Sequence, residues 1–285
     1  MRVAISGTSG QVGSALHRLL EQAGGHEILT LARPHGDITD RRKVMRAIMA
    51  FQPDIVLNSA AYTNVDQAES EPDAAYRVNA LGVQNLALAC AASGAALATI
   101  STNCVFDGLH TEPYWEFDKP NPTSVYGRSK LAGEWYAQNL LTKFYIVRTS
   151  WVFGSKPAAG RGNFVTRMLQ LGDERGSLTV VDDEISNPTY AQDLAVALLE
   201  LIQTEAFGVY HLMNEGPASR YEFTREILRL GGRNQVELKP GKLADFKRAT
   251  PPLPYTALKN FCAGELGIRL RPWQAAVAAY MQEQV

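Results

Sequence analysis

The chain has 285 residues, of which 46% are hydrophobic and 20% charged, and its formal net charge is −1. This balance is typical of a globular protein and excludes the basic surface that nucleic acids or anionic membranes attract. The three cysteines, Cys90, Cys104 and Cys262, form no close pair, so we expect a reducing compartment, the cytoplasm, and neither a disulfide framework nor a zinc site. We expect no signal segment and no membrane span, because no apolar run approaches about 18 residues.

The first half of the chain alternates short apolar runs with longer amphipathic segments. The runs predict strands at residues 3–5, 28–31, 54–58, 96–100 and 144–148. The segments between them predict helices at 11–23, after an Asp40 cap, at 73–92, and after a Ser124 cap, with a loop at 108–122. Strands that alternate with helices of this length predict a doubly wound parallel sheet of the Rossmann type, in the α/β class.

The pattern weakens after Trp151. Helices are predicted at residues 160–176, 190–203, 220–230 and 273–282, strands at 178–181 and 208–213, and a loop at 239–254. The strand at 208–213 is expected to join the main sheet. We therefore predict a dinucleotide-binding domain made of residues 1–151 and 187–213, and a smaller, discontinuous substrate-binding lobe made of residues 152–186 and 214–285.

Three glycines, Gly7, Gly10 and Gly13, follow the first predicted strand and lead into the first predicted helix. In such a turn the glycines permit a tight bend and a close approach of backbone to a pyrophosphate, which then meets the helix N-terminus. The context favours dinucleotide binding over a purely structural turn. The residues expected to contact the cofactor here and after the second and third strands are Gly7, Ser9, Gly10, Gln11, Val12, Gly13, Asp37, Ile38, Ala60, Ala61 and Tyr62.

The end of the second strand bears on the choice of cofactor. NAD sites usually place an acidic residue there against the ribose 2′-hydroxyl, and this chain has Ala32-Arg33-Pro34 instead. Arg33 could pair with a 2′-phosphate, so we expect NADPH, with NADH as the alternative. The competing interpretation is that Arg33 is a solvated surface residue.

Tyr126 and Lys130 stand four residues apart on a predicted helix, so both side chains lie on one face. Thr102 ends a strand 24 residues upstream of Tyr126, whereas a second such pair, Tyr255 and Lys259, follows no hydroxyl-bearing strand end. An ammonium near a phenol lowers its pKa, so the predicted chemistry is reduction of a carbonyl by a nicotinamide, with Tyr126 supplying the proton. Lys130 would also bind the ribose, and Thr102 would bond the carbonyl oxygen or Tyr126. The alternatives are a core tyrosine and a strand-end threonine.

Several longer motifs extend this pattern along nearly the whole chain. They are residues 7–13 (GTSGQVG), 53–58 (PDIVLN), 60–69 (AAYTNVDQAE), 101–108 (STNCVFDG), 125–134 (VYGRSKLAGE), 148–152 (RTSWV), 187–189 (NPT) and 270–273 (LRPW). With them the chain resembles the extended short-chain dehydrogenase/reductases and, among these, the dTDP-4-dehydrorhamnose reductase family. The resemblance implies a catalytic Thr102, Tyr126 and Lys130, and NAD(P)H-dependent reduction of dTDP-4-dehydro-L-rhamnose to dTDP-L-rhamnose.

The resemblance also implies substrate contacts, and the chain departs from the family at some of them. Trp151 is expected to line the sugar pocket, with interdomain packing as the alternative. Asn187 and Thr189 are expected to contact the nucleotide-sugar or to form a turn. Asn103 and Cys104 are expected at the substrate, where the family usually has aspartate and often tyrosine. The three adjacent carboxylates of residues 182–184 are expected to form a solvated acidic loop rather than a Mg²⁺ site, so no metal is predicted.

Two other functions stay open. One is reduction of a different nucleotide-linked 4-keto-6-deoxy sugar by a sister 4-ketoreductase, which the change at Asn103 and Cys104 keeps open. The other is an NADP-binding regulatory subunit similar to that of methionine adenosyltransferase. The expected partner is a nucleotide-sugar, with no nucleic acid and no membrane, and a homodimer is left open.

Overall fold

Six parallel strands form the central sheet of the protein, for which a computed structural model describes residues 1–32, 36–155 and 163–283. The strand order is β10-β5-β4-β3-β1-β2, and every neighbouring pair is parallel. The strands are β1 (Arg2–Ser6), β2 (Glu27–Leu31), β3 (Ile55–Asn58), β4 (Ala96–Thr102), β5 (Phe144–Thr149) and β10 (Gly208–His211). The predicted parallel sheet is confirmed, and so is the expectation that the segment beginning at residue 208 joins it.

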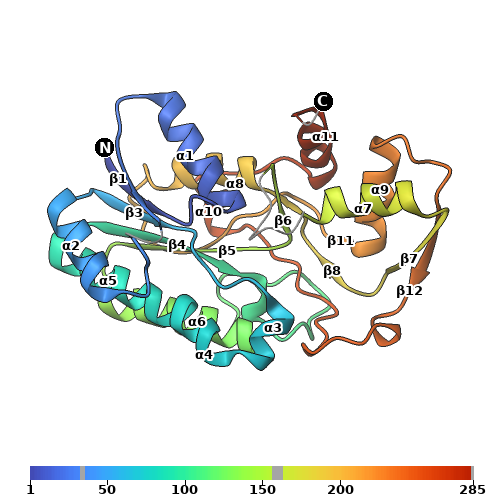
Figure 1. Ribbon diagram of the computed structural model, residues 1–285, viewed down its shortest axis with the longest axis horizontal. Coiled ribbons are helices and arrows are strands. Elements are labelled where there is room, and N and C mark those ends of the chain that lie inside the picture. Colours follow the sequence, from blue (N-terminus) through green and yellow to red (C-terminus); the bar gives the residue numbers. More distant parts are fainter. Residues whose placement is uncertain (33–35, 156–162, 284–285) are drawn as a thin grey trace.

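Helices cover both faces of this sheet (Figure 1). On one face lie α1 (Gln11–Ala23) and α8 (Ala191–Leu201), which pack against each other; on the other lie α2 (Arg41–Phe51), α5 (Gly82–Ser93) and α6 (Val125–Leu140). The predicted caps are confirmed, because Asp40 accepts hydrogen bonds from the amides of Arg42 and Lys43 and Ser124 accepts one from that of Gly127. These caps satisfy amides that have no partner within the helix.

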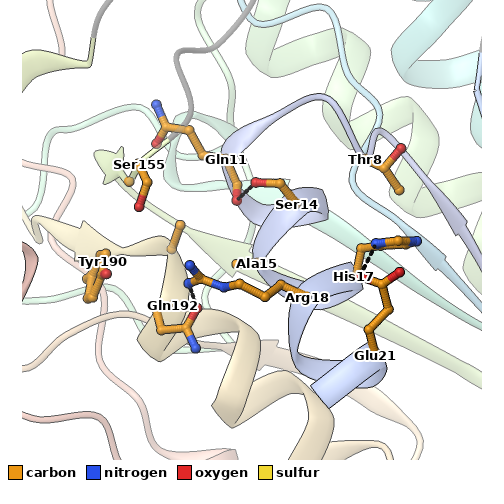
Figure 2. Close-up of a pocket in the computed structure, with 12 residues that line it drawn as sticks. Thr8, Gln11, Ser14, Ala15, His17, Arg18, Glu21, Ser155, Tyr190 and Gln192 are labelled. Atoms are coloured by element: carbon orange, nitrogen blue, oxygen red, sulfur yellow. Dashed lines mark hydrogen bonds and ion pairs between the residues drawn. The ribbon is translucent and has the colours of Figure 1, made fainter. Parts of the chain in front are cut away.

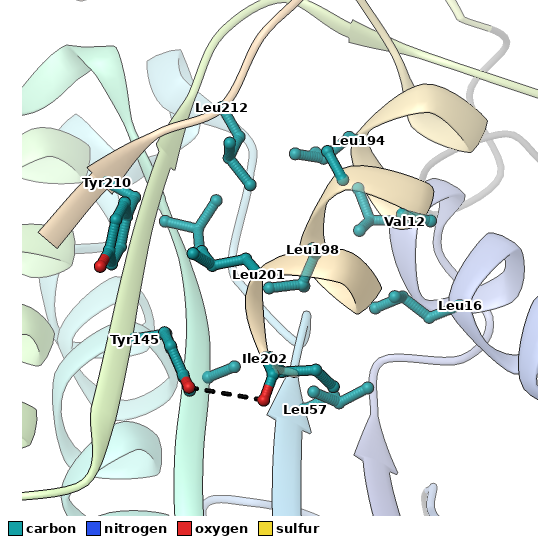
Figure 3. Close-up of a cluster of buried hydrophobic side chains, with 14 of the residues drawn as sticks. Val12, Leu16, Leu57, Tyr145, Leu194, Leu198, Leu201, Ile202, Tyr210 and Leu212 are labelled. Atoms are coloured by element: carbon teal, nitrogen blue, oxygen red, sulfur yellow. Dashed lines mark hydrogen bonds between the residues drawn. The ribbon is translucent and has the colours of Figure 1, made fainter. Parts of the chain in front are cut away.

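The contact between α1 and α8 combines a polar rim with an apolar interior. At the rim, Arg18 Nη2 donates to Gln192 Oε1 at 2.6 Å beside a small cavity of about 200 Å³ (Figure 2). Beneath it, leucine side chains of α1, α8 and β3 fill the space above the sheet (Figure 3). Leu16, Leu57 and Leu201 have no exposed surface. The helices therefore shield this face of the sheet from solvent, and a ligand would reach the sheet at the ends of its strands.

The segment predicted as one helix at 73–92 is interrupted. It consists of α4 (Pro72–Tyr76), a π-helical turn (Arg77–Leu81) and α5, and it is preceded by α3 (Val65–Ser70), which the sequence did not predict. The π turn carries Asn79, whose side-chain amide exchanges two hydrogen bonds with the backbone of Tyr62, at 2.8 and 3.0 Å. The π turn therefore coincides with hydrogen bonds between Asn79 and a distant stretch of backbone. Single π turns within helices are common near functional sites.

A second lobe lies beyond the carboxyl ends of β4 and β5 (Figure 1). Its described residues include three two-stranded sheets and three helices of 11 residues each, around an aromatic core in which Phe153 and Phe223 are fully buried. The elements are β6 (Val152–Phe153), α7 (Phe164–Glu174), β7 (Ser177–Val181), β8 (Ile185–Ser186), β9 (Thr189–Tyr190), β11 (Ala218–Ser219), α9 (Arg220–Leu230), β12 (Glu237–Gly241) and α11 (Trp273–Glu283).

The lobe differs from the prediction mainly in its short elements. The predicted loop at 239–254 begins with β12, which pairs with β7, and continues with a 3₁₀ turn at Leu243–Asp245. A further short helix, α10 (Cys262–Glu265), packs near β10. The proposed domain boundaries stay a prediction. Within the described ranges, no helix is both long and apolar enough to cross a membrane.

Candidate active site

One continuous cavity of about 1070 Å³ runs along the carboxyl ends of the central strands and under the second lobe. Its lining includes most of the residues that the sequence singled out. These are Gly7, Ser9, Gly10, Gln11, Val12, Gly13, Asp37, Ile38, Ala60, Ala61, Tyr62, Thr102, Asn103, Cys104, Tyr126, Lys130 and Trp151. Arg33 lies outside the described residues, so its expected role stays a prediction.

The glycine turn at one end of the cavity is packed so closely against backbone that it has no room for side chains at two positions. Gly7 has φ +75°, and a Cβ there would lie 2.5 Å from the amide nitrogen of Ala60. A Cβ on Gly13 would lie 2.2 Å from the Gly7 carbonyl oxygen. Since side chains are excluded at both positions, the backbone itself forms the floor of the cavity, and the first turn of α1 carries no acidic residue. Such a surface fits a pyrophosphate at a helix N-terminus.

Thr102 and Tyr126 meet in the middle of the cavity. Thr102 is the last residue of β4, and Tyr126 is the second residue of α6, where the Ser124 cap orients the first turn. Both side chains are buried, and Thr102 neighbours the Tyr126 hydroxyl while its own hydroxyl donates to Asn103 Oδ1 at 3.2 Å. Burial raises the pKa of Tyr126, and the neighbouring Thr102 hydroxyl offsets this only in part. The predicted lowering of the Tyr126 pKa was therefore wrong, because loss of solvation outweighs every favourable contact.

The contacts of Lys130 explain why it does not lower the pKa of Tyr126. Lys130 Nζ donates to the Ile100 carbonyl oxygen at 2.6 Å, so the ammonium is directed to β4. Burial lowers the Lys130 pKa to about 8, against an opposing effect of Glu134. Glu134 itself is held by a buried ion pair with Arg148 at 2.7 Å and by the Ser101 hydroxyl. A fixed carboxylate thus lies behind the lysine and favours its charged form.

Asn103 lines the cavity, and its side-chain amide hydrogen-bonds within the junction between β4 and the second lobe. Its Nδ2 donates to Thr256 Oγ1 at 2.7 Å and to Ser186 Oγ at 3.0 Å, and its Oδ1 accepts from Thr102 Oγ1 at 3.2 Å. Cys104, by contrast, packs beside Tyr126, and burial raises the pKa of its thiol. A raised thiol pKa disfavours the nucleophilic thiolate.

At the other end of the cavity, Trp151 is covered by a cation. Trp151 adopts φ +40°, uncommon for a non-glycine residue, and the guanidinium of Arg220 lies 3.5 Å from the centre of its ring. Glu184 is buried between Arg220 and Arg248, with Nε and Nη2 at 3.7 and 3.1 Å from its Oε2. Trp151 therefore belongs both to the cavity wall and to the packing between the lobes.

Asn187 and Thr189 do not line the cavity within the described residues. Asn187 Oδ1 accepts from the amide of Leu258 at 2.7 Å, and its Nδ2 donates to the Gly216 carbonyl at 3.2 Å. Thr189 is fully buried and bonds the Asn187 carbonyl. These contacts favour the alternative interpretation of the two residues as a turn that connects segments of the lobe.

The comparisons with known proteins agree along the full length of the chain. A family model described as the RmlD substrate binding domain matches residues 1–285. The dTDP-4-dehydrorhamnose reductase of Mycobacterium tuberculosis (strain ATCC 25618 / H37Rv) is 40% identical over 286 residues, covering 97% of this chain and 91% of that protein. The chain belongs to the dTDP-4-dehydrorhamnose reductase family. The spore coat polysaccharide biosynthesis protein SpsK of Bacillus subtilis (strain 168) is also 40% identical, over 99% of this chain and 98% of its own.

A solved structure of the same family shares the fold described here. The dTDP-4-dehydrorhamnose reductase of Bacillus anthracis str. Ames, solved in complex with NADP, superimposes with a TM-score of 0.94 at 37% identity, and 99% of each chain is covered. As a family member, the present chain therefore has the Rossmann-type sheet and the second lobe in the arrangement of a solved reductase.

Several cavity residues of this family member escaped the sequence analysis. They are Asp66, Glu184, Arg220, Arg248, Thr250 and Thr256, among others. The expectation of a solvated acidic loop at residues 182–184 was wrong, because Glu184 is buried against two arginines, while Asp182 accepts from Ser219 and Asp183 from the amide of Leu243. Among the residues described, no group of three or more His, Cys, Asp or Glu side chains is arranged to hold a metal ion.

Proposed function

We propose that this protein is an NADPH-dependent oxidoreductase that reduces the 4-keto group of a nucleotide-linked 4-keto-6-deoxy sugar, converting dTDP-4-dehydro-L-rhamnose to dTDP-L-rhamnose. The observation that carries the proposal is the single cavity, which connects the glycine turn, the Thr102–Tyr126 contact and the Trp151–Arg220 wall. A dinucleotide at one end and a sugar nucleotide at the other would meet at Thr102 and Tyr126. The related enzyme of Bacillus anthracis, solved with NADP, supports the choice of cofactor.

The roles of the residues follow from their positions. When bound, the nicotinamide supplies a hydride to the carbonyl carbon. Tyr126 gives its proton to the carbonyl oxygen, and Thr102 donates a hydrogen bond to the same oxygen, so that negative charge does not accumulate there. Lys130 is largely charged at neutral pH beside Glu134 and would attract the electron-rich oxygens of the cofactor ribose.

The far wall of the cavity suits the diphosphate of a sugar nucleotide. Arg220 and Arg248 both pair with Glu184, so two guanidinium groups share one carboxylate at this wall. Guanidinium groups bind phosphate oxygens well because their donors match the geometry. The Trp151 ring between this wall and Thr102 offers an apolar face against which a pyranose could stack.

The decisive experiment follows absorbance of NADPH, and separately of NADH, with enzymatically generated dTDP-4-dehydro-L-rhamnose, and identifies the product by NMR. Oxidation with dTDP-L-rhamnose as product supports the proposal; tight NADPH binding without oxidation contradicts it.

We expect Arg33→Ala to weaken the binding of NADPH much more than the binding of NADH, because only NADPH carries the 2′-phosphate. Equal losses in a fluorescence titration would reject that role.

Two alternatives are separated by the same assay. A sister 4-ketoreductase is favoured by the occurrence of Asn103 and Cys104 at the site, and it would oxidise NADPH with another nucleotide-linked ketosugar but not with this one. An NADP-binding regulatory subunit would bind NADPH, oxidise none, and retain a partner enzyme in a pull-down.

We also propose a cytoplasmic location, consistent with three free cysteines. Light scattering would show whether two copies of the chain form a dimer.

A further inference from the structure

A buried carboxylate, that of Glu134, lies one helical turn beyond Lys130 on α6. Glu134 is only 2% exposed, whereas Lys130 lines the large cavity. Residues four apart on a helix share a face, so the two side chains are neighbours on α6. The carboxylate can therefore act on Lys130 from within the protein, while a ligand would meet the lysine from the cavity.

Glu134 is held in place by donors from two strands of the central sheet. On β5, Arg148 Nη2 donates to Glu134 Oε2 at 2.7 Å and Arg148 Nε to Oε1 at 3.1 Å. On β4, the Ser101 hydroxyl donates to the same Oε1. Arg148 is 3% exposed and Ser101 is also buried, so these bonds form away from water. A bidentate pair with a third donor fixes both the position and the ionised state of the carboxylate.

This arrangement leaves the ammonium of Lys130 with donors to spare. An ammonium has three N–H donors, and one of them goes to the Ile100 carbonyl oxygen at 2.6 Å. Glu134 favours the charged form of Lys130 by its charge, while its own oxygens are engaged by Arg148 and Ser101. A carboxylate without such partners would bond the ammonium directly and compete with a ligand for it. The other donors of the lysine are therefore available on the cavity side.

We propose that Glu134 is a positioning residue, which keeps Lys130 charged while Arg148 and Ser101 keep the Glu134 oxygens from binding the ammonium, so that lysine donors are left for the ribose of the cofactor. This inference rests on the proposed function, in which the ribose lies against Lys130. It assigns a role in cofactor binding to a group that touches neither ligand.

The test uses Glu134→Gln, which keeps the shape of the side chain and removes its charge. We expect the Kd of NADPH in the wild type, measured by fluorescence titration, to rise about tenfold as pH increases through about 8 and Lys130 loses its proton. In Glu134→Gln the same rise should occur at a pH lower by about one unit or more, because the buried Arg148 cation then lacks its anion and disfavours a second positive charge. Near pH 6 the two Kd values should agree within about threefold.

Other groups that titrate are common to all the proteins compared. On the described elements packed against α6, the other charged groups are Asp66, Glu69, Asp73 and Arg77, and the titratable groups beside the site are Cys104 and Tyr126. Every variant retains them, and the ligand is the same in each titration. A displacement of the alkaline limb between variants therefore reports on Lys130.

A second variant covers the case in which Glu134→Gln fails to fold. Removing one partner of a buried ion pair is strongly destabilising, whereas removing both is often tolerated, so Glu134→Gln is also combined with Arg148→Met. Without the uncompensated cation, the alkaline limb of this double variant should lie between those of wild type and Glu134→Gln. Asp193→Asn is the matched control, because it removes the carboxylate of another bidentate pair, with Arg271 on the far side of α8, and should leave the limb unmoved. If the limb stays at the wild-type pH in both Glu134 variants, or if Asp193→Asn moves it equally, the proposal is wrong.

A measurement without cofactor separates this proposal from the proposed function. A lysine whose folded-state pKa lies below its ordinary value costs stability at neutral pH, and the cost grows as that pKa falls. At pH 7, Lys130→Met should therefore raise the midpoint of urea unfolding more in the Glu134→Gln background than in the wild type, and equal gains would overturn the proposal. A protein that binds no NADPH at any pH would defeat the proposed function, and this double-mutant cycle would still decide whether Glu134 acts on Lys130.

Discussion

At the scale of single residues, burial decides how Tyr126 and Thr102 act together. The raised pKa of Tyr126 keeps its hydroxyl protonated throughout the neutral range, so the proton is always present for transfer. The acceptor is an oxygen that becomes an alkoxide as hydride arrives, and an alkoxide is far more basic than a phenolate. The tyrosine therefore needs no lowered pKa in the resting site to serve as a donor, since the driving force develops during the reaction.

This argument leads to a prediction for Tyr126→Phe. The variant keeps the ring and its packing and loses only the proton, so NADPH oxidation should fall at least about 100-fold while the Kd of NADPH changes less than about threefold. Tyr145→Phe is a matched control, because that buried hydroxyl donates to the Ile202 carbonyl at 3.5 Å in the apolar core (Figure 3). Unchanged turnover of Tyr126→Phe would reject the assigned role.

Lys130 makes a separate prediction about stability. Its folded-state pKa of about 8 lies below the ordinary lysine pKa of 10.5, so the folded protein binds fewer protons than the unfolded chain between these pH values. The sign follows directly: the lysine costs stability in full below about pH 8, and this cost disappears as pH rises through 10.5. Lys130→Met should therefore raise the free energy of unfolding by up to about 3 kcal/mol at neutral pH and by less near pH 10.

Denaturant unfolding at several pH values would measure this difference. The exposed Lys143→Met is the control and should show no pH-dependent gain. A gain for Lys130→Met that does not shrink at alkaline pH would mean that removal of the buried charge is not its cause.

At the scale of elements, α6 reaches its position because Gly127 has no side chain. A Cβ on Gly127 would lie 2.1 Å from the Cys104 carbonyl oxygen, so any other residue would push α6 away from the end of β4. Tyr126 precedes this glycine and Thr102 lies two residues before Cys104. The close packing of helix and strand end therefore sets the distance between the two hydroxyl groups.

We expect Gly127→Ala to lower kcat at least about tenfold, because a displacement of about 1 Å at reacting groups can cost two orders of magnitude in rate. The glycine turn on β1 is untouched, so the Kd of NADPH should change much less than kcat. Gly176→Ala is the control, since a Cβ there meets no atom within 4 Å and its φ is not positive. If turnover of Gly127→Ala equals that of Gly176→Ala, α6 is not held by this contact.

The elements that the sequence predicted well are those with a strong local signal. A few neighbouring residues are enough to predict the strands β1, β3, β4 and β5 from their apolar runs and the helix caps at Asp40 and Ser124. The π turn at Arg77–Leu81 and the two-residue strands β6, β8, β9 and β11 have no such signal, because distant backbone partners create them. For the same reason Glu184 seemed solvated, since the two arginines that bury it lie 36 and 64 residues further along the chain.

At the scale of the whole molecule, the site lies between the ends of the sheet and the second lobe. Residues 1–13 and 100–130 were recognisable from their motifs, because glycine spacing and the Tyr126–Lys130 pair reflect chemistry that is local in sequence. The opposite wall comes from Arg220, Arg248 and Thr250, whose positions depend on the path of the chain through the lobe. Tertiary closure therefore supplies the part of the site that sequence periodicity could not predict.

One direct bond across the mouth of the cavity is that between Thr250 and Asp66. Thr250 Oγ1 and its amide nitrogen both donate to Asp66 Oδ1, at 2.6 and 3.2 Å, and so connect the segment after β12 to α3. Both residues line the cavity, together with Arg248 of the second lobe. The bond should therefore hold the lobe over a bound sugar nucleotide without bearing on the dinucleotide.

Thr250→Val tests this arrangement, because it removes the hydroxyl but retains the amide and the side-chain volume. A hydrogen bond to a charged group is worth about 1.5–3 kcal/mol, so the KM of the nucleotide-sugar should rise about tenfold or more. The Kd of NADPH should stay within about twofold, since the glycine turn lies at the other end. Thr204→Val removes a hydroxyl that donates to the Leu201 carbonyl at the opposite edge of the sheet and should change neither constant. A Thr250→Val enzyme that loses NADPH affinity as strongly as sugar affinity would show that the lobe closes on both ligands together rather than on the sugar nucleotide alone.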